Sequence, residues 1–264
     1  MSNWQKGTKN FKTIKLGSPT SFWSYGLERR LYLVKQQVDF YGKKVLDVGC
    51  GLGMFLNKFS SLSEPAFDGK VQNTIVYGID VDKRKIEIAK HKFSNVQVAR
   101  AEKLPFSRKF FDIVFSHETL EHVDDDKKAI IEALRVLKTG GKMIIFCPNK
   151  RWPFETHGIY LRGKYHFGNI FGVTYLPKFL YKKLTPHVRN YSNKDLLSLF
   201  PQKSIKIIHH SHVFPGLDGL VTKTGLGGKF IRKILEFLER TPLHYFGISH
   251  FLVVEKLGDR QIDD

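Results

Sequence analysis

Between residues 44 and 147, short runs of apolar and β-branched residues alternate with stretches of helical periodicity. This alternation is typical of a parallel β-sheet with helices on both faces, because the crossover between two parallel strands usually carries a helix. Gly140 and Gly141 should close the last helix, and residues 61–73 should form a polar surface loop. We predict strands at 44–49, 74–80, 95–99, 111–116 and 141–147, and helices at 54–61, 82–92 and 126–137.

The pattern changes after Pro148. Residues 151–190 are aromatic and basic, have no clear period and contain three prolines, which indicates an insertion that covers the functional site. A helix from Asn193, a strand at 204–212 and a final strand at 248–256 follow.

An amphipathic helix is predicted at residues 229–240, between the last two strands. Such a helix packs on its own domain or lies on a membrane surface. Its apolar face consists of Phe230, Ile231, Ile234, Phe237 and Leu238.

The segment VLDVGCGLG, residues 45–53, predicts a ligand-binding loop at the end of the first strand. Gly49, Gly51 and Gly53 let the backbone turn sharply and approach a ligand closely, and Asp47 should lie near the carboxyl end of the strand. A dinucleotide fingerprint needs its third glycine where Met54 stands, so NAD is disfavoured. The alternative is a tight strand-to-helix turn without a ligand.

Composition limits the possible partners and the cellular location of the protein. A net charge of +18 predicts attraction to an anionic partner, which could be nucleic acid, an anionic lipid surface or a phosphorylated substrate. The alternative is a basic soluble surface without a dedicated partner. Two cysteines are too few for a disulfide framework and fit a reducing, cytoplasmic location. We expect no signal peptide and no transmembrane segment, because no sufficiently long apolar run occurs. The sequence leaves the oligomeric state open.

Four motifs in order resemble the class I S-adenosylmethionine-dependent methyltransferases, particularly the branch of the quinone-biosynthesis enzymes, over residues 43–149. VLDVGCGLG is similar to the family's first motif, which holds the methionine end of S-adenosylmethionine. The second motif, VYGID, ends in Asp80, whose carboxylate would accept bonds from both ribose hydroxyls. The third, ARAEKLPF, is similar to the adenine-contacting segment, and the fourth is FFDIVFSHETLEHV.

The resemblance implies further cofactor contacts. The family often has Asp where this chain has Arg100, so we assign the adenine amino group to Glu102 and a ring nitrogen to the Ala101 amide. Glu102 could instead be a solvated charge. The fourth motif would bring Ser116 and His117 to the carboxyl edge of the sheet, where ligands bind in open α/β folds.

The resemblance also implies a fold: an α/β, Rossmann-like, doubly wound sheet of seven mostly parallel strands with an antiparallel last strand. The aromatic and basic insertion would follow strand five. The expected organisation is an N-terminal helical cap at 1–42, a cofactor-binding core at 43–149, the insertion at 150–192, and a C-terminal part of the same sheet at 193–264.

Glu118, Glu121 and His122 would share one face if they lie on one helical turn, and would then suit a divalent metal. This turn is similar to the metal-binding turn of demethylubiquinone O-methyltransferases and small-RNA terminal 2′-O-methyltransferases. Elsewhere in the family the same Glu and His only cap the next helix. His157 is the candidate fourth ligand.

We expect transfer to an oxygen of a small or lipid-like acceptor. His117 or His157 would remove the proton of the acceptor hydroxyl, because histidine titrates near neutral pH. Alternatively, a bound metal would lower the pKa of that hydroxyl directly. Aromatic side chains of the insertion would cover an apolar acceptor. They are Trp152, Phe154, Tyr160, Tyr165, Phe167 and Tyr175.

Two alternatives stay open. The first is RNA 2′-O-methylation, because basic residues of the insertion alternate with aromatic residues that could stack on bases. The second is a non-catalytic binding protein on the same fold. In each case the protein could be peripheral to a membrane. The RNA hypothesis rests on Lys178, Lys182, Lys183, Arg189 and Lys194, with Phe179, Tyr181 and Tyr191.

Overall fold

The computed structural model describes residues 24–65 and 71–258. Its centre is a seven-stranded sheet in the order β12-β13-β7-β6-β1-β4-β5. All neighbours pair in parallel except β13, which runs antiparallel to both β7 and β12. The strands are β1 Lys44–Val48, β4 Ile75–Asp80, β5 Val96–Val98, β6 Phe111–His117, β7 Leu137–Pro148, β12 Ile205–Val213 and β13 Ser249–Lys256. The predicted Rossmann-like architecture is therefore confirmed.

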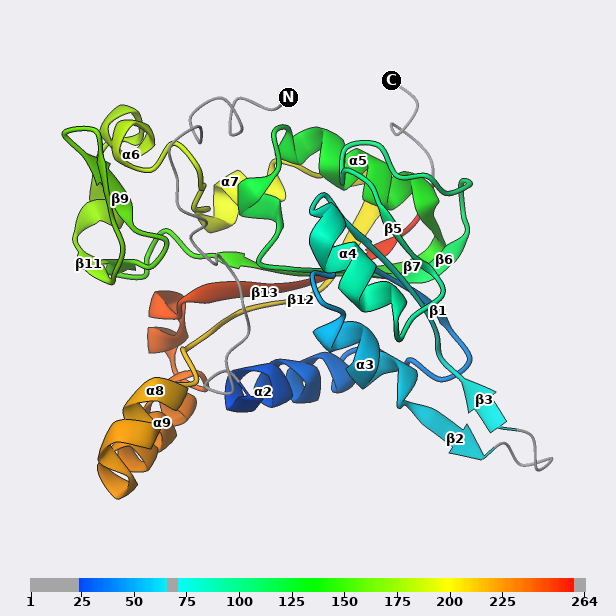
Figure 1. Ribbon diagram of the computed structural model, residues 1–264, viewed down its shortest axis with the longest axis horizontal. Coiled ribbons are helices and arrows are strands. Elements are labelled where there is room, and N and C mark those ends of the chain that lie inside the picture. Colours follow the sequence, from blue (N-terminus) through cyan, green and yellow to red (C-terminus); the bar gives the residue numbers. More distant parts are fainter. Residues whose placement is uncertain (1–23, 66–70, 259–264) are drawn as a thin grey trace.

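Helices cover both faces of the sheet (Figure 1), as the pattern predicted. One face packs on α5 and α7 around Leu134 and Leu196. The other packs on α2, α3 and α4 around Val34, Phe59 and Ile86. The helices are α2 Ser24–Lys35, α3 Met54–Ser60, α4 Lys83–Lys90, α5 Asp126–Val136, α6 Lys178–Leu184, α7 Asn193–Leu197, α8 Asp218–Thr224 and α9 Leu226–Leu238, with 3₁₀ turns η2 Leu120–His122, η3 Val173–Tyr175, η4 Gln202–Ser204 and η5 Pro242–Phe246.

Short strands form three small ribbons outside the main sheet. The region predicted as a surface loop contains the ribbon β2–β3, and the insertion contains the pairs β8–β11 and β9–β10. The insertion has its own small core of Ile159, Val173 and Tyr181. The bounds are β2 Ser63–Pro65, β3 Val71–Asn73, β8 Phe154–Glu155, β9 Ile159–Leu161, β10 Lys164–His166 and β11 Ile170–Phe171.

One expectation about the elements is wrong. α5 ends at Val136, and β7 begins at Leu137, so Gly140 and Gly141 do not close the helix but lie within the strand. Gly140 has φ 76 there, in the stretch where the pairing of β6 and β7 shifts register, so these glycines accommodate an irregular strand start.

The predicted amphipathic helix exists, as α9, but its apolar face does not pack on the domain: Phe230 is 67% and Phe237 65% exposed.

The insertion follows β7, and the α8–α9 pair follows β12. Because these two strands run in the same direction, both segments leave the sheet at the carboxyl edge of the parallel strands, and Figure 1 shows them on the same side of the molecule. The four-part division of the chain stays a prediction, and residues 1–23 of the expected cap lie outside the described residues.

Candidate active site

The glycine loop after β1 is left-handed at all three glycines, with φ 81 at Gly49, 53 at Gly51 and 83 at Gly53. A Cβ on Gly49 would lie 2.2 Å from Thr119 Oγ1, and one on Gly53 would lie 2.7 Å from the ring of Phe93. A Cβ on Gly51 would meet no atom within 4 Å. Neighbouring side chains therefore occupy the space beside two of the glycines, whereas the space beside Gly51 is open to a ligand.

Two carboxylates lie beside this loop. Asp80, at the end of β4, accepts hydrogen bonds from the backbone N–H of Gly51 at 2.9 Å and of Asp82 at 2.8 Å. Each carboxylate oxygen keeps a further lone pair for a ligand hydroxyl. Asp47 is only 2% exposed, and burial, followed by the charge of Asp80, raises its pKa to about 8.

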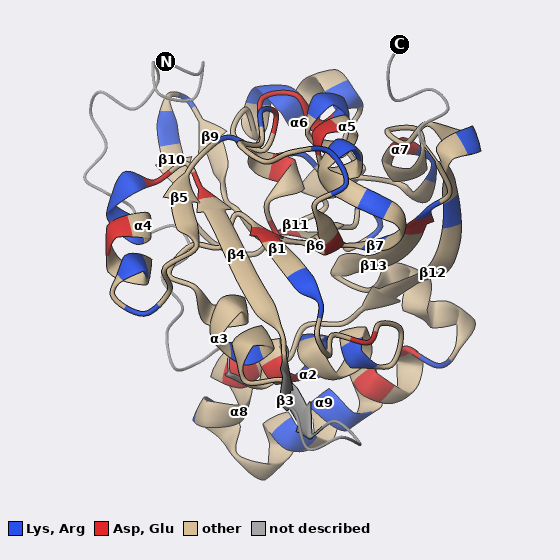
Figure 2. Cartoon of the chain, turned by 90° about the vertical axis from the view of Figure 1, so that its right-hand side faces the viewer, with Lys and Arg blue, Asp and Glu red and all other residues tan. Residues whose placement is uncertain are grey.

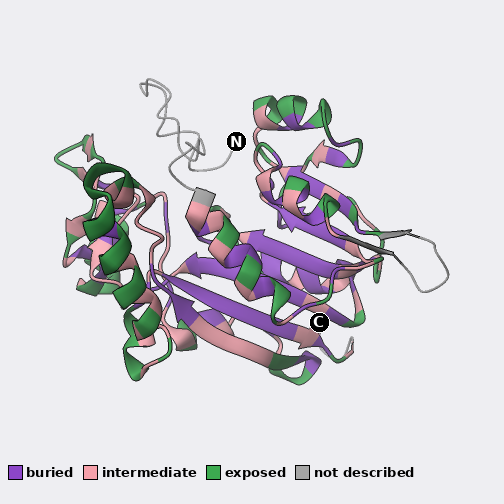
Figure 3. Ribbon diagram, turned by 90° about the horizontal axis from the view of Figure 1, so that it is seen from below, coloured by how far each residue is buried: buried purple, intermediate pink, exposed green. Residues whose placement is uncertain are grey.

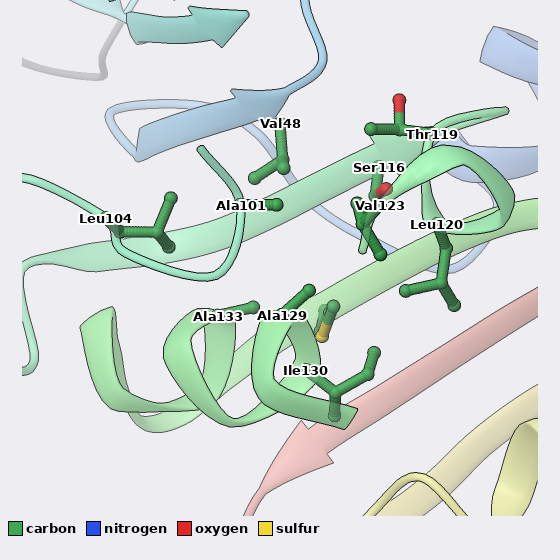
Figure 4. Close-up of a pocket in the computed structure, with 11 residues that line it drawn as sticks. Val48, Ala101, Leu104, Ser116, Thr119, Leu120, Val123, Ala129, Ile130 and Ala133 are labelled. Carbon is green, nitrogen blue, oxygen red and sulfur yellow. The ribbon is translucent and has the colours of Figure 1, made fainter. Parts of the chain in front are cut away.

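Residues from three of the four motifs line one small cavity between the sheet and α5 (Figure 4). Val48 comes from β1, Ala101 and Leu104 from the third motif, and Ser116 from β6. The predicted cofactor contacts Ala101 and Ser116 are thus brought together against an apolar wall.

Glu102 has a structural partner in the same region. Its Oε1 accepts hydrogen bonds from the backbone N–H of Asp124 at 2.8 Å and of Asp125 at 3.3 Å, and from Arg100 at 3.1 Å. Glu102 therefore ties the third motif to the start of α5 and is not a solvated charge. Its adenine contact, and the roles of the other cofactor residues, stay predictions.

The turn after β6 differs from the single helical turn that the sequence suggested. Glu118 is left-handed, with φ 49, and only Leu120–His122 is helical, as a 3₁₀ turn. Glu118 therefore lies outside the helical turn, although its carboxylate stays close enough to Glu121 to raise the pKa of that group. Its carboxylate accepts a hydrogen bond from Ser249 Oγ at 2.6 Å and lies 3.8 Å from the guanidinium of Arg30.

Glu121 and His122 instead converge with His157, and one ligand atom from each lies within 4.8 Å of the other two. Among the described residues, neither oxygen of the buried Glu121 carboxylate has a hydrogen-bond partner. Burial, followed by the charge of Glu118, raises the pKa of Glu121 well above its usual value. A buried carboxylate without a partner is costly unless a proton or cation neutralises it, so this donor set fits a divalent metal.

Both histidines of this cluster are oriented by groups that the sequence analysis missed. His157 Nδ1 lies 3.2 Å from Glu155 Oε1, which also accepts a bond from the His157 backbone N–H at 2.8 Å. His122 Nδ1 lies 3.2 Å from the backbone oxygen of His187. In both rings Nε2 is the nitrogen left for a metal or a proton. Only the i, i+2 spacing of Glu155 and His157 hinted at this pairing.

His117, the other candidate base, is enclosed by the rings of Phe55, Phe115 and Phe146. Burial, followed by the charge of Arg30, lowers its pKa to about 3. A histidine in this setting is a weak base near neutral pH, and its catalytic role stays a prediction.

Two aromatic residues of the RNA hypothesis are buried. Tyr181 is 5% and Tyr191 3% exposed, and their hydroxyls bond to Glu155 and to the backbone oxygen of Leu120. They are not available for stacking on bases. Arg189 likewise donates to the backbone oxygen of Asp124, whereas Phe179 is 72% exposed.

Figure 2 shows Lys and Arg on several helices and on the edge strand β12, not on one element alone. In residues 24–65 and 71–258, no helix is long and apolar enough to cross a membrane.

The sheet order, the glycine loop after the first strand and the carboxylate ending the next strand define a class I methyltransferase-type fold. A sequence model of the family described as "Methyltransferase domain" matches residues 46–145. The chain therefore contains a class I S-adenosylmethionine-dependent methyltransferase domain, as its motifs predicted.

Named relatives match this domain. The ubiquinone biosynthesis O-methyltransferase of Coxiella burnetii is 31% identical over 129 residues, which cover 47% of this chain and 51% of that protein. An O-methyltransferase of Aspergillus nomiae is 29% identical over 123 residues, 41% of this chain and 51% of that one. The chain thus spans about half the length of these curated relatives.

Solved structures share the fold. An S-adenosylmethionine-dependent methyltransferase from Mesorhizobium loti superimposes with a TM-score of 0.56 at 16% identity, over 85% of this chain and 96% of that one. A possible histamine N-methyltransferase from Thermotoga maritima gives 0.53 at 17% identity, over 90% and 91%. At this identity the likeness shows the fold alone.

Proposed function

We propose that this protein transfers a methyl group from S-adenosylmethionine to a hydroxyl of a lipid-like acceptor at a membrane surface. The observation that carries the proposal is the convergence of Glu121, His122 and His157 within 4.8 Å. This cluster follows Thr119, which packs against the glycine loop at Gly49. This neighbourhood supports a role for the cluster in removing a hydroxyl proton beside the proposed cofactor site.

The cofactor residues have separate roles in this proposal. S-adenosylmethionine, when bound, supplies a methyl group already activated by its sulfonium. The open space at Gly51 admits the methionine end, and Asp80 accepts bonds from the ribose hydroxyls. Ala101, Glu102 and Ser116 face the adenine side. Transfer then depends mainly on alignment of the acceptor and exclusion of water.

The acceptor side relies on the oriented histidines. Glu121, His122 and His157 would hold a divalent ion, which supplies a Lewis acid that lowers the pKa of the acceptor hydroxyl. Glu155 fixes His157 through Nδ1, and the His187 carbonyl fixes His122. If no ion is bound, Nε2 of His157 would instead accept the hydroxyl proton, since Nδ1 is held by Glu155, and the Glu155 carboxylate would stabilise the resulting cation.

α9 supports a lipid surface as the source of the acceptor, because Arg232, Glu236 and the C-cap residue Glu239 bond to the protein while most of its large apolar residues face outward. Glu239 pairs with Arg29 of α2 at 2.6 Å, Arg232 pairs with Asp218 of α8 at 3.1 Å, and Glu236 accepts from the Tyr25 hydroxyl. Figure 3 shows the α8–α9 pair, at the left of the view, as largely exposed while the sheet is buried. The outward residues are Leu226, Phe230, Ile231, Ile234 and Phe237.

The insertion adds exposed rings on the same side of the molecule: Phe167 is 75%, Phe171 72% and Phe179 72% exposed. Exposed apolar patches of this kind mark interaction surfaces. The net charge of +18 is compatible with an anionic membrane as the partner. The reducing, cytoplasmic location expected from the sequence completes the proposal.

The test is methyl transfer from radiolabelled S-adenosylmethionine to separate lipid, small-molecule and RNA extracts, with and without a chelator. We expect label in the lipid fraction, loss of transfer with chelator, and recovery on addition of a divalent metal. His157→Gln and Glu121→Gln should each reduce turnover by at least about 100-fold, the scale of a lost catalytic proton-transfer group. His166→Gln, an exposed histidine of the same insertion, is the control.

Each result has a defined meaning. Label in the RNA fraction alone would overturn the lipid acceptor, and chelator-resistant transfer would overturn the metal but retain His157 as base. Retention of the cofactor without transfer to any fraction would indicate a binding protein.

A further inference from the structure

We propose that His210, His212, His244 and His250 form a second metal site, for a transition-metal ion such as zinc, on the strand pair β12–β13. This site is separate from the Glu121 cluster and does not depend on the identity of the methyl acceptor. One ligand nitrogen from each of His210, His212 and His250 lies within 4.8 Å of the other two.

The strand register brings the histidines together. β12 and β13 are antiparallel, with His212 opposite His250 and His210 opposite Leu252. Because side chains alternate along a strand, these three histidines project from one face of the sheet. His244 reaches the same place from η5, and its ring lies 5.3 Å from that of His212.

Hydrogen bonds fix the tautomers of the two most buried rings. His250 Nε2 donates to the backbone oxygen of Tyr191 at 2.8 Å, and His212 Nε2 donates to the side-chain oxygen of Asn193 at 2.9 Å. In a neutral ring, Nδ1 then carries a lone pair. This pattern, one ring nitrogen donating to an oxygen while the other stays free, is characteristic of metal-ligating histidines.

Two nitrogen separations, one in each of two histidine pairs, are close to those between ligands of a tetrahedral ion. Two ligands with zinc–nitrogen bonds of about 2.0–2.1 Å lie about 3.3–3.4 Å apart in a tetrahedron. His210 Nε2 lies 3.1 Å from His250 Nδ1, and His212 Nδ1 lies 3.3 Å from His244 Nδ1. Without a metal, these two pairs form nitrogen–nitrogen hydrogen bonds that the ion would replace.

The ligand atoms of the four histidines determine which class of metal the site would bind. Four imidazoles without a carboxylate favour zinc, copper, nickel or cobalt over magnesium or calcium. Two of the rings, His212 and His250, are shielded from solvent, with 1% and 0% exposure. His210 and His244 are only half-buried, which gives the ion a route of entry.

The experiment titrates cobalt(II) into metal-free full-length protein in a Glu121→Gln, His157→Gln background, so that the first cluster cannot contribute. We expect one equivalent bound with the absorption bands of tetrahedral cobalt, displaced by zinc, and a rise in thermal unfolding temperature. His210→Gln should weaken binding by at least about 10-fold, since even loss of an outer partner of a ligand costs that much.

His209→Gln is the matched control, because His209 lies in the same strand, faces the opposite side and bonds to Ser211. It should bind cobalt like the background. His244→Gln, outside the sheet, provides a second ligand variant should His210→Gln fail to fold. Absence of tetrahedral cobalt bands, or equal weakening by His209→Gln, would overturn the site.

Discussion

Gly51 provides the sharpest test of the cofactor site among single residues. It has positive φ and open space where a Cβ would lie, and Gly140 shares both properties outside the site. Alanine should therefore cost each position about 1–2 kcal/mol of stability through the left-handed backbone.

We expect only Gly51→Ala to weaken S-adenosylmethionine binding in calorimetry, by at least about 10-fold, or about 1.4 kcal/mol. Equal affinities of the two variants would show that the open space is not used by the cofactor.

Asp47 should make the stability of the folded protein fall as pH rises. Its pKa rises from 3.8 to about 8 on folding, so between these values the folded state holds a proton that the unfolded state has lost. This term lowers the free energy of unfolding as pH rises from about 4 to about 8. Asp47→Asn removes it, so the variant should gain stability relative to the parent across that range, measured by urea unfolding.

Asp112 is the control of opposite sign. Its hydrogen bonds to Lys138 and to the Lys44 backbone outweigh burial and lower its pKa. Asp112 therefore begins to stabilise the folded state as pH rises through about 4. As pH rises through about 4, Asp112→Asn should therefore lose stability relative to the parent protein. Asn variants with the same pH trend would refute this account of both residues.

The site residues easiest to predict were those whose position follows from their immediate neighbours in the sequence. The glycine loop and Asp80 could be placed because each follows an apolar strand, and parallel strands end at one edge. Glu155 and His187 could not be assigned their orienting roles, since their partners depend on how the insertion folds back over the turn after β6. The left-handed Glu118 was equally hidden, because a helical spacing does not reveal a strained residue before the turn.

α9 is the element whose role is most open to test. Its outward face should insert into lipid, where burial of each phenylalanine contributes about 1.5–3 kcal/mol. Replacing Phe230 and Phe237 together with serine should lower partitioning into vesicles about 100-fold or more, measured by sedimentation. Folding stability should change little, because both side chains are exposed in the folded protein.

Ile88→Ser is the control for α9, since Ile88 is 57% exposed on α4. It should leave vesicle binding unchanged. If it reduces binding as much as the phenylalanine variant, the apolar face of α9 is not the docking surface.

The strands of the main sheet and most helices that cover it were predicted in type, and less well at their ends, whereas the short ribbons, α6 and α8 were not predicted. The seven strands follow from their apolar runs. The boundary between α5 and β7 was misplaced because Gly140 and Gly141 are equally suited to a helix end and to an irregular strand. The amphipathic pattern of α9 was evident, but the side that faces the protein depends on Arg29, Asp218 and Tyr25, which are distant in sequence.

The whole molecule carries a net charge of +18, which should make membrane binding depend on salt. Raising ionic strength from about 0.1 to about 1 M shortens the Debye length from about 10 to about 3 Å. Binding to phosphatidylserine-containing vesicles should fall over this range, and the weaker binding to phosphatidylcholine vesicles should not. Salt-independent binding to both would assign attachment to α9 alone.

The shared side of the insertion and the α8–α9 pair has a kinetic consequence. A catalyst held there would meet its acceptor by diffusion in two dimensions. Its turnover would follow the mole fraction of acceptor within the bilayer, and adding inert lipid would slow the reaction by dilution even when the total amount of acceptor in the tube stays constant.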